Sequence, residues 1–209
     1  MSSRTLRMAG WLLLIAAVIS LVSTVLGIVI PGPAGPNGPP ANIVSVINLV
    51  AGILFLVSLP SAYLAQKQVG VVGLIGIIAL WITVVLFDIV LSIISIIFVS
   101  SNQVSSATGS PPTYLFILFL VGTILALIGG VLLGLRTIQV RVFPAAIGWL
   151  LIVAAILNAV DFPLQGTIST IVSTLSSVLL FVSLGWLGYA ITTHAAEAVM
   201  EPTVRKASM

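Results

Sequence analysis

The feature that most constrains this chain is the apolar stretch at residues 69–100, VGVVGLIGIIALWITVVLFDIVLSIISIIFVS, whose one charged residue is Asp88. A hydrophobic run of roughly 18 residues or more predicts a transmembrane helix. Helices are expected because lipid offers no partner to an unpaired backbone N–H or C=O group. The run is apolar on both faces, which argues against the alternating strands of a membrane β-barrel.

Five other apolar segments accompany this stretch, and together they predict an all-α protein, a transmembrane bundle of six helices in a single domain. Only 5% of the 209 residues are charged, whereas a soluble domain carries about 25%. Lipid is therefore the expected surroundings, and each segment is expected to cross a core of about 30 Å at about 1.5 Å per residue. The expected spans are residues 8–30, 41–65, 69–100, 113–135, 144–161 and 166–193, followed by a short polar tail at 194–209.

The basic residues predict the orientation of this bundle. With six spans, all seven lysines and arginines fall on one side, namely Arg4, Arg7, Lys67, Arg136, Arg141, Arg205 and Lys206. Basic residues are concentrated on the cytoplasmic side of membrane proteins, so both termini are expected there. Because these cations act as topology signals, the net charge of +3 does not indicate binding to nucleic acid.

Similar sequences predict a parallel repeat of the first and last pairs of spans. GWLLLIAAVIS at residues 10–20 returns as GWLLIVAAILN at residues 148–158. The matched polar positions of the second helix in each pair are Ser45, Asn48 and Gly52 opposite Thr170, Ser173 and Ser177. Two interpretations stay open. The match reflects either a true duplication or the similar apolar composition that membrane helices share. In both, the polar faces are expected to turn toward protein, where they meet each other or line a shallow cleft.

A ladder of small residues predicts close helix packing in the fourth span. It consists of Gly122, Ala126, Gly130 and Gly134, at a strict spacing of four residues. Small side chains let two helix backbones approach closely in a membrane. The partner helix is expected either from this chain or from another subunit.

The few polar side chains within the spans are the candidate functional residues. The set comprises Asp88, Ser92, Asn48, Asn158, Asp161 and Ser173. Asp88 is interpreted either as a proton, cation or substrate contact or as an interfacial carboxylate bonded to serine or tryptophan. Asp161 and Asn158 either close the fifth span or share an outer polar pocket with Asp88 and the serines of the last span. The single histidine, His194, is either an axial cofactor ligand or an interfacial residue.

The sequence holds no catalytic constellation, so a non-enzymatic role is expected and no cofactor is indicated. One histidine and no cysteine cannot form a zinc-type cluster, and there is no phosphate-binding glycine loop or Ser/His/Asp set. The first hypothesis is an accessory or structural subunit that packs against other integral membrane subunits. The competing hypothesis is a small-solute transporter or substrate-binding membrane component, and a third is a cofactor-carrying subunit.

Parts of the chain resemble small bacterial multi-span membrane proteins of unknown function. The similarity lies in LPSAYLAQ at residues 59–66, in GVVGLIG at residues 70–76, and in the GWLL openings of the first and fifth spans. The resemblance implies a six-helix bundle in a prokaryotic plasma membrane. It implies no activity and no functional residue.

Overall fold

The computed structural model describes residues 3–29, 39–65, 70–100, 113–164 and 166–207, and these residues are helical apart from short turns. The all-α class expected from the sequence is confirmed. The helices are α1 (Ser3–Val29), α2 (Pro39–Ala65), α3 (Gly70–Val84), α4 (Leu91–Ser100), α5 (Thr113–Val140), α6 (Ala145–Asp161) and α7 (Gly166–Ala207). A π-helix, η1 (Val85–Val90), joins α3 to α4 in one continuous rod.

Within the described residues, five helical segments are long and apolar enough to cross a membrane, which makes the chain a polytopic membrane protein. They are Arg4–Ile28, Ile43–Ala62, Gly70–Ile97, Leu115–Val140 and Gly166–Thr193. The remaining expected span, residues 144–161, is α6, whose 17 residues make a helix of only about 26 Å. Its bounds agree with the expected span to within one residue, but the length is less than a hydrocarbon core of about 30 Å.

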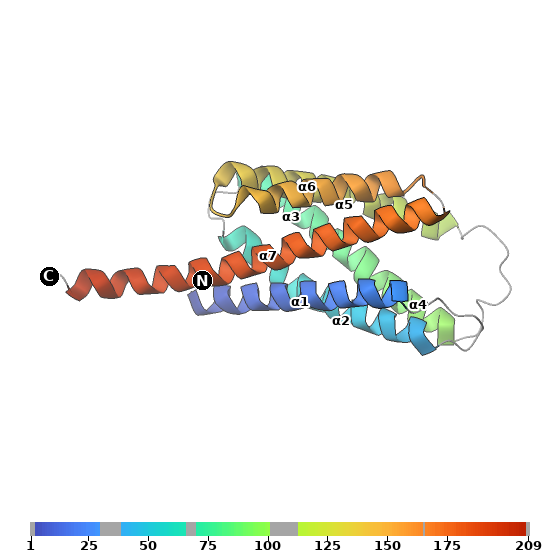
Figure 1. Ribbon diagram of the computed structural model, residues 1–209, viewed down its shortest axis with the longest axis horizontal. Helices are drawn as coiled ribbons and strands as arrows, with labels where there is room; N and C mark the ends of the chain where they lie inside the picture. Colours follow the sequence, from blue (N-terminus) through green and yellow to red (C-terminus); the bar gives the residue numbers. More distant parts are fainter. Residues whose placement is uncertain (1–2, 30–38, 66–69, 101–112, 165, 208–209) are drawn as a thin grey trace.

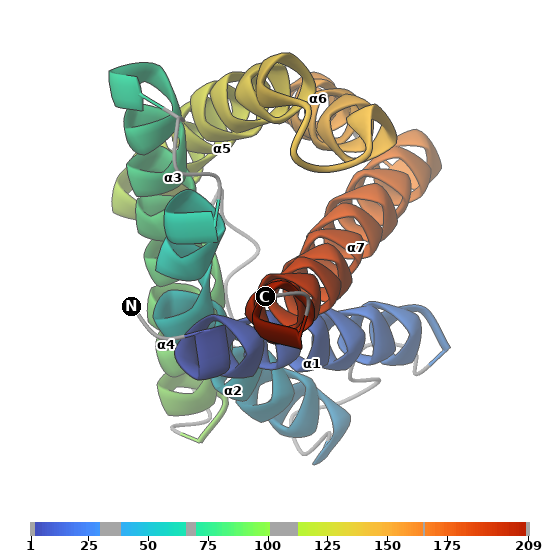
Figure 2. The same cartoon turned by 90° about the vertical axis from the view of Figure 1, so that its left-hand side faces the viewer.

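The helices form a closed ring in the order α1, α2, the α3–η1–α4 rod, α5, α6 and α7, and α7 packs back against α1. Figure 2 shows this ring along the bundle axis, and Figure 1 shows it from the side. We call the end at which α1 and α3 begin the proximal end, and the end at which α2, α5 and α7 begin the distal end. The α3–η1–α4 rod runs obliquely from one end to the other (Figure 1).

The surface of the ring is apolar, and its interior holds many small and polar side chains. On α1, the exposed hydrophobic residues recur every three or four positions, at Met8, Trp11, Ile15, Val18, Val22 and Val25. The opposite face of α1 is buried and carries Ala16, Ala17, Ser20 and Ser23. This distribution suits a lipid solvent, in which small side chains favour helix–helix contact and polar groups avoid the acyl chains.

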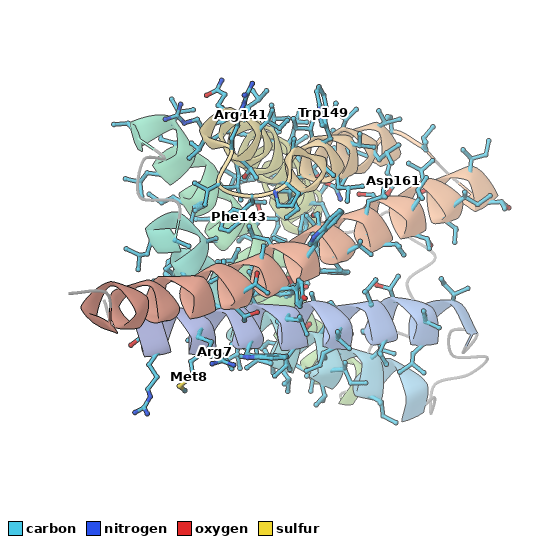
Figure 3. The ribbon with its side chains drawn as sticks, turned by 60° about the vertical axis from the view of Figure 1, so that its left-hand side comes forward. Arg7, Met8, Arg141, Phe143, Trp149 and Asp161 are labelled. Carbon is cyan, nitrogen blue, oxygen red and sulfur yellow. The ribbon has the colours of Figure 1, made fainter. Side chains whose placement is uncertain are left out.

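Close-packed apolar side chains fill the proximal half of the ring. The fully buried residues there include Leu13, Leu59, Leu133, Ile147 and Leu187, one from each of five helices. They belong to one continuous cluster that also contains Phe143, from the turn between α5 and α6. Figure 3 shows Arg7 and Arg141 toward this proximal end and Asp161 toward the distal end.

Three pairs of glycines mark the points where helix backbones approach most closely. A Cβ added to Gly10 of α1 would lie 2.8 Å from the carbonyl oxygen of Gly188 in α7. The other two pairs are Gly76 of α3 with Gly129 of α5, and Gly134 of α5 with Gly148 of α6. A larger side chain at these crossings would push the backbones apart, which explains why the chain has glycine there.

Two expectations about the ends of the helices need correction. The tail expected at 194–209 continues α7 as helix to Ala207, because alanine, glutamate and methionine in AAEAVME are strong helix formers. The expected connector at 31–40 is shorter, since Pro39 and Pro40 open α2, in the first turn where proline is tolerated. The rest of this connector and the side chain of His194 lie outside the described residues.

Candidate functional site

A cavity of about 340 Å³ lies inside the ring, between the apolar cluster and the distal ends of α6 and α7. Five residues of the cluster also line the cavity, namely Phe55, Leu59, Leu80, Val84 and Leu184. Its walls come from α2, the α3–η1–α4 rod, α5, α6 and α7. The polar lining residues are Thr83, Asp88, Thr123, Asn158, Asp161, Ser176 and Ser177. The aromatic lining residues are Phe55, Phe87, Phe119, Phe162 and Phe181.

Asp88 lies on the π-helix η1, which widens one turn of the rod. In η1 the backbone N–H of Leu91 bonds to the carbonyl oxygen of Leu86, five residues earlier. Such turns are rare and are frequent at functional sites. Gly52 of α2 packs directly against this turn, because a Cβ at Gly52 would lie 2.7 Å from the Cβ of Asp88. The absence of a side chain at Gly52 therefore makes room for Asp88.

The stripe of polar residues around Asp88 bonds to α2 and leaves the carboxylate without a partner. The Trp81 indole N–H donates to the carbonyl oxygen of Leu56 at 2.8 Å, and the hydroxyls of Ser45 and Ser95 lie 3.0 Å apart in a hydrogen bond. Neither Trp81 nor Ser95 bonds to Asp88, which removes the serine and tryptophan partners expected for an interfacial carboxylate. Among the described residues, the structure gives the Asp88 carboxylate no hydrogen bond or ion pair.

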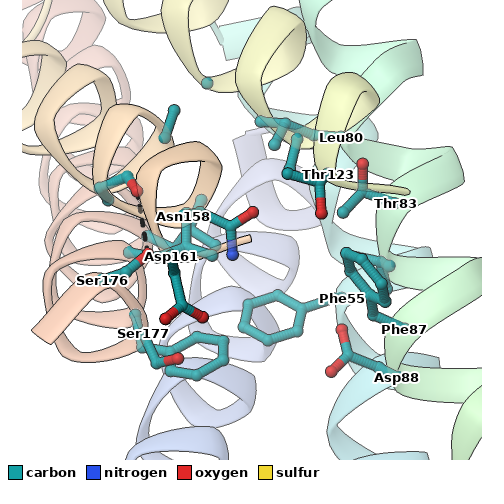
Figure 4. A pocket seen from close by; sticks show the side chains of 18 of the residues that line it. Phe55, Leu80, Thr83, Phe87, Asp88, Thr123, Asn158, Asp161, Ser176 and Ser177 are labelled. Atoms are coloured by element: carbon teal, nitrogen blue, oxygen red, sulfur yellow. Dashed lines mark hydrogen bonds between the residues drawn. The ribbon is translucent and has the colours of Figure 1, made fainter. Parts of the chain in front are cut away.

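The opposite wall carries a second group of polar side chains, at the distal ends of α6 and α7. The Ser169 hydroxyl donates to Oδ1 of Asp161 at 2.7 Å, and the Ser176 hydroxyl donates to the carbonyl oxygen of Ala154 at 2.9 Å. Oδ1 of Asn158 is buried and has no partner among the described residues. Figure 4 shows Asp161, Asn158 and Ser177 facing Asp88 and Phe87 across the cavity.

The structure brings together half of the polar residues singled out in the sequence. Asp88, Asn158 and Asp161 line the same cavity, together with Ser176 and Ser177 of α7. The other three candidates, Ser92, Asn48 and Ser173, are outside its lining. The Ser173 hydroxyl instead donates to the carbonyl oxygen of Thr170 on its own helix, and Ser92 is buried.

The two matched polar faces have different partners. The face of α2 with Ser45 and Gly52 packs against α4 and η1, whereas Ser177 on the corresponding face of α7 lines the cavity. The two faces therefore do not share the contacts that a structural duplication would be expected to preserve. The parallel repeat stays a prediction.

The small-residue ladder of α5 serves two neighbouring elements of this chain and the cavity. A Cβ at Gly122 would contact the Phe87 ring of η1, one at Gly130 would lie 2.6 Å from the Cβ of Ala155, and Gly134 meets Gly148. Ala126, between them, lines the cavity. A spacing of four residues rotates about 40° per step on a helix of 3.6 residues per turn. The ladder consequently turns by about 120° from Gly122 to Gly134, from the rod toward α6.

The sequence analysis missed the aromatic lining and the glycine crossings outside the ladder. Phenylalanine is equally common on lipid-facing and buried positions of membrane helices, so the sequence did not show that five rings converge. The ring pairs Phe55–Phe181 and Phe87–Phe119 have centroid separations of 6.0 and 5.8 Å. Gly76 occurs in a segment with glycines at 70, 73 and 76, a three-residue spacing that could have suggested a packing face.

No protein-family model, curated protein or solved structure matches this chain. The resemblance to small bacterial membrane proteins therefore identifies no family. What the fold and the hydropathy support is a polytopic helical membrane protein with five apolar spans.

The arrangement is suited to binding a small molecule. Pockets that hold small ligands are mostly apolar, have volumes of about 300–1,000 Å³, and carry a few polar groups that orient the ligand. This cavity has the size and the lining of such a pocket. In the described part of the chain, no three side chains of the His, Cys, Asp and Glu types gather as a metal site requires.

Proposed function

We propose that this chain is a non-catalytic membrane component that binds a small solute in the cavity, as a transporter or a substrate-binding subunit does. The observation that carries the proposal is the Asp88 carboxylate, which lines a cavity of about 340 Å³ without a partner among the described residues. A polar residue inside a membrane bundle is costly and is usually functional. A hydrogen-bonding or charged solute would supply the missing partner.

The same contacts weaken the case for an accessory subunit. One observation behind that hypothesis was the ladder of α5, whose partner helix was expected either from this chain or from another subunit. Gly122, Gly130 and Gly134 are already covered by η1 and α6 of this chain, so they offer no free face for a partner subunit. The accessory role remains the alternative, and the binding experiment below distinguishes the two.

We further propose that α6 is a sixth span and that both termini are cytoplasmic. α5 ends at the proximal end and α7 begins at the distal end, so α6 traverses the bundle between them. Figure 3 shows Arg7 and Arg141 toward the proximal end. Arg4 lies in the first turn of α1 and Arg136 in the last turns of α5, which are at the same end. Basic residues favour the cytoplasmic side, and in the orientation that we propose the cavity lies in the outer half of a plasma membrane.

Cysteine labelling tests this orientation, because the chain contains no cysteine of its own. Val142 in the turn between α5 and α6 and Pro163 in the turn between α6 and α7 are both exposed. In intact cells, Pro163→Cys should react with a membrane-impermeant maleimide, and Val142→Cys should react only after permeabilisation. Equal access from outside would show that α6 does not cross the membrane, and the reversed pattern would invert the orientation.

A cavity-filling variant tests solute binding. Thr123 lines the cavity, and its neighbour Ile124 on α5 is exposed on the outer surface. The purified protein in lipid nanodiscs would be incubated with a mixture of small amines, alcohols and carboxylic acids, and retained molecules identified by mass spectrometry. We expect the wild type and Ile124→Phe to retain a compound that Thr123→Phe does not retain.

Two results would count against solute binding. Retention by Thr123→Phe equal to that of the wild type would place the compound outside the cavity. If no compound is retained, and other integral membrane proteins co-purify from native membrane in fixed stoichiometry, the accessory role is the correct one.

A further inference from the structure

The charges around the cavity restrict the solute it can take. Two carboxylates, Asp88 and Asp161, line it, and among the described residues its lining contains no lysine, arginine or histidine. Asp161 accepts a hydrogen bond from Ser169, whereas Asp88 has no such bond to any described residue. A carboxylate removed from water is strongly destabilising unless a positive group approaches it. Binding of a cation is therefore expected to be most favourable at the Asp88 carboxylate.

The remaining lining favours an organic cation over a metal ion. Hard cations such as Ca²⁺ require six or more oxygen ligands, and this cavity presents its few oxygens on opposite walls (Figure 4). Five phenylalanine rings line the space between them. Aromatic faces attract organic ammonium groups, most strongly where water is excluded, and their apolar area accommodates a hydrocarbon body.

The volume also suits a compound of one aromatic ring. An apolar cavity of about 150 Å³ suffices to hold benzene, and the cavity here has about 340 Å³. A ring with a short amine-bearing chain would therefore fit, with space for its ammonium group beside Asp88. The Phe87 ring lies next to Asp88 on the same wall (Figure 4) and pairs with Phe119 at 5.8 Å.

We infer that the cavity binds a small organic monocation, an amine with an apolar or aromatic body, whose charge is held by Asp88 and whose body packs among the phenylalanine rings. This inference rests on the proposed function, since it names the class of solute for the same cavity. Asp161, which already has a hydrogen-bond donor, contributes less to the charge contact. The preference is for the charge and size of the compound, and it requires no reaction at the site.

Three compounds of nearly equal size test the inference by titration calorimetry on the protein in nanodiscs. At pH 7 benzylamine is a cation, benzyl alcohol is neutral and benzoate is an anion, and empty nanodiscs correct for partition into lipid. We expect the wild type to bind benzylamine at least about tenfold more tightly than benzyl alcohol, and benzoate least. Asp88→Asn should abolish most of this preference, by about tenfold, because it weakens benzylamine binding more than benzyl alcohol binding.

Asp161→Asn is the matched control, because it also removes one carboxylate from the cavity wall. It should change benzylamine binding by less than about threefold, since its carboxylate is already engaged by Ser169. Benzyltrimethylammonium, a permanent cation, should compete with benzylamine on the wild-type protein. This competition measures the charge preference even if Asp88→Asn does not fold.

The outcomes separate the inference from the proposed function. Equal binding of benzylamine and benzyl alcohol, both lost in Thr123→Phe, would overturn the charge preference and leave solute binding in the cavity intact. A preference for benzylamine that survives in folded Asp88→Asn would overturn the assignment to Asp88. Absence of binding by all these compounds would overturn the inference, whereas retention of another compound in the mass-spectrometric experiment would keep the proposed function.

Discussion

The two halves of the bundle fill the space between their helices in opposite ways. In the proximal half, large apolar side chains such as Leu13 and Ile147 are fully buried, and the backbones of α5 and α6 meet at Gly134 and Gly148. In the distal half, the same ring encloses a cavity lined by Asp88 and Asp161. Exposed hydrophobic residues cover the outer surface of both halves, so the hollow arises from the side chains that face inward.

The helix α5 shows how one element contributes to both halves. Its proximal residues Gly130 and Gly134 allow α6 to approach closely, whereas Ala126, one ladder step nearer the distal end, borders the cavity. Because the helix rotates along the ladder, small residues at the same spacing pack against a neighbour at one level and leave space at another. A small residue therefore indicates close packing only where a neighbouring helix lies over it.

The largest expected effect comes from placing a bulky side chain at the contact between α5 and α6 in the proximal half. In Gly134→Leu, a side chain would occupy the position of the α6 backbone, where a Cβ alone lies 2.6 Å from the carbonyl oxygen of Gly148. We expect a loss of at least about 3 kcal/mol, or a fall in Tm of about 10 °C in detergent. Gly27→Leu is the control, because a Cβ at Gly27 has no atom within 4 Å. Equal melting of the two variants would mean that the crossing contributes nothing to stability.

An effect of intermediate size is expected when alanine is replaced by leucine once in each half of the bundle, and its size should differ between the halves. Ala16 is fully buried in the proximal cluster, and Ala16→Leu should lower the free energy of unfolding by about 1–3 kcal/mol through overpacking. Ala126→Leu would extend into the cavity and should change it by less than about 0.5 kcal/mol. Denaturation of both variants in mixed micelles measures the difference, and equal losses would show that the distal half is as tightly filled as the proximal half.

The smallest effect is expected at Asp88. Without ligand, Asp88→Asn should be tolerated, with a Tm equal to that of the wild type or raised by about 2–4 °C. The amide keeps the shape of the side chain and removes the cost of a charge within the membrane. Such a gain in stability with a loss of binding is common when a functional polar group is removed. A lower Tm in Asp88→Asn, measured by the same thermal assay, would mean that the carboxylate holds the distal half together.

Much of the fold could be predicted from apolar runs alone, because lipid leaves helices as the available structure and the ends of the runs lie near the ends of the helices. The start of α5 at Thr113 and the end of α6 at Asp161 coincide with the expected bounds. Whether the 17-residue helix α6 crosses the membrane could not be predicted, since hydropathy reports where a helix lies and says little about whether its length matches the membrane.

The site was only partly predictable. Asp88 and Asp161 stood out because charges are rare inside spans, and one hypothesis placed them in a shared pocket. Asp88 lines the cavity from η1, and no residue type in VLFDIV predicts a π-turn. The contact between this turn and Gly52 of α2 is tertiary and does not appear in the sequence. The converging phenylalanine rings were hidden for a similar reason, since their facing depends on the rotation of five helices.

The π-turn also has a consequence for the lengths that related chains can take. A hydrogen bond from residue i to i+5 encloses one residue more than the α-helical bond from i to i+4. Deleting a single residue within Val85–Val90 would let the flanking helices join as one regular helix. The side chains of both helices would keep their directions relative to each other. A deletion elsewhere in a span would instead rotate everything beyond it by about 100°. Descendants of this sequence can therefore lose one residue at this turn, and with it the widened turn that carries Asp88.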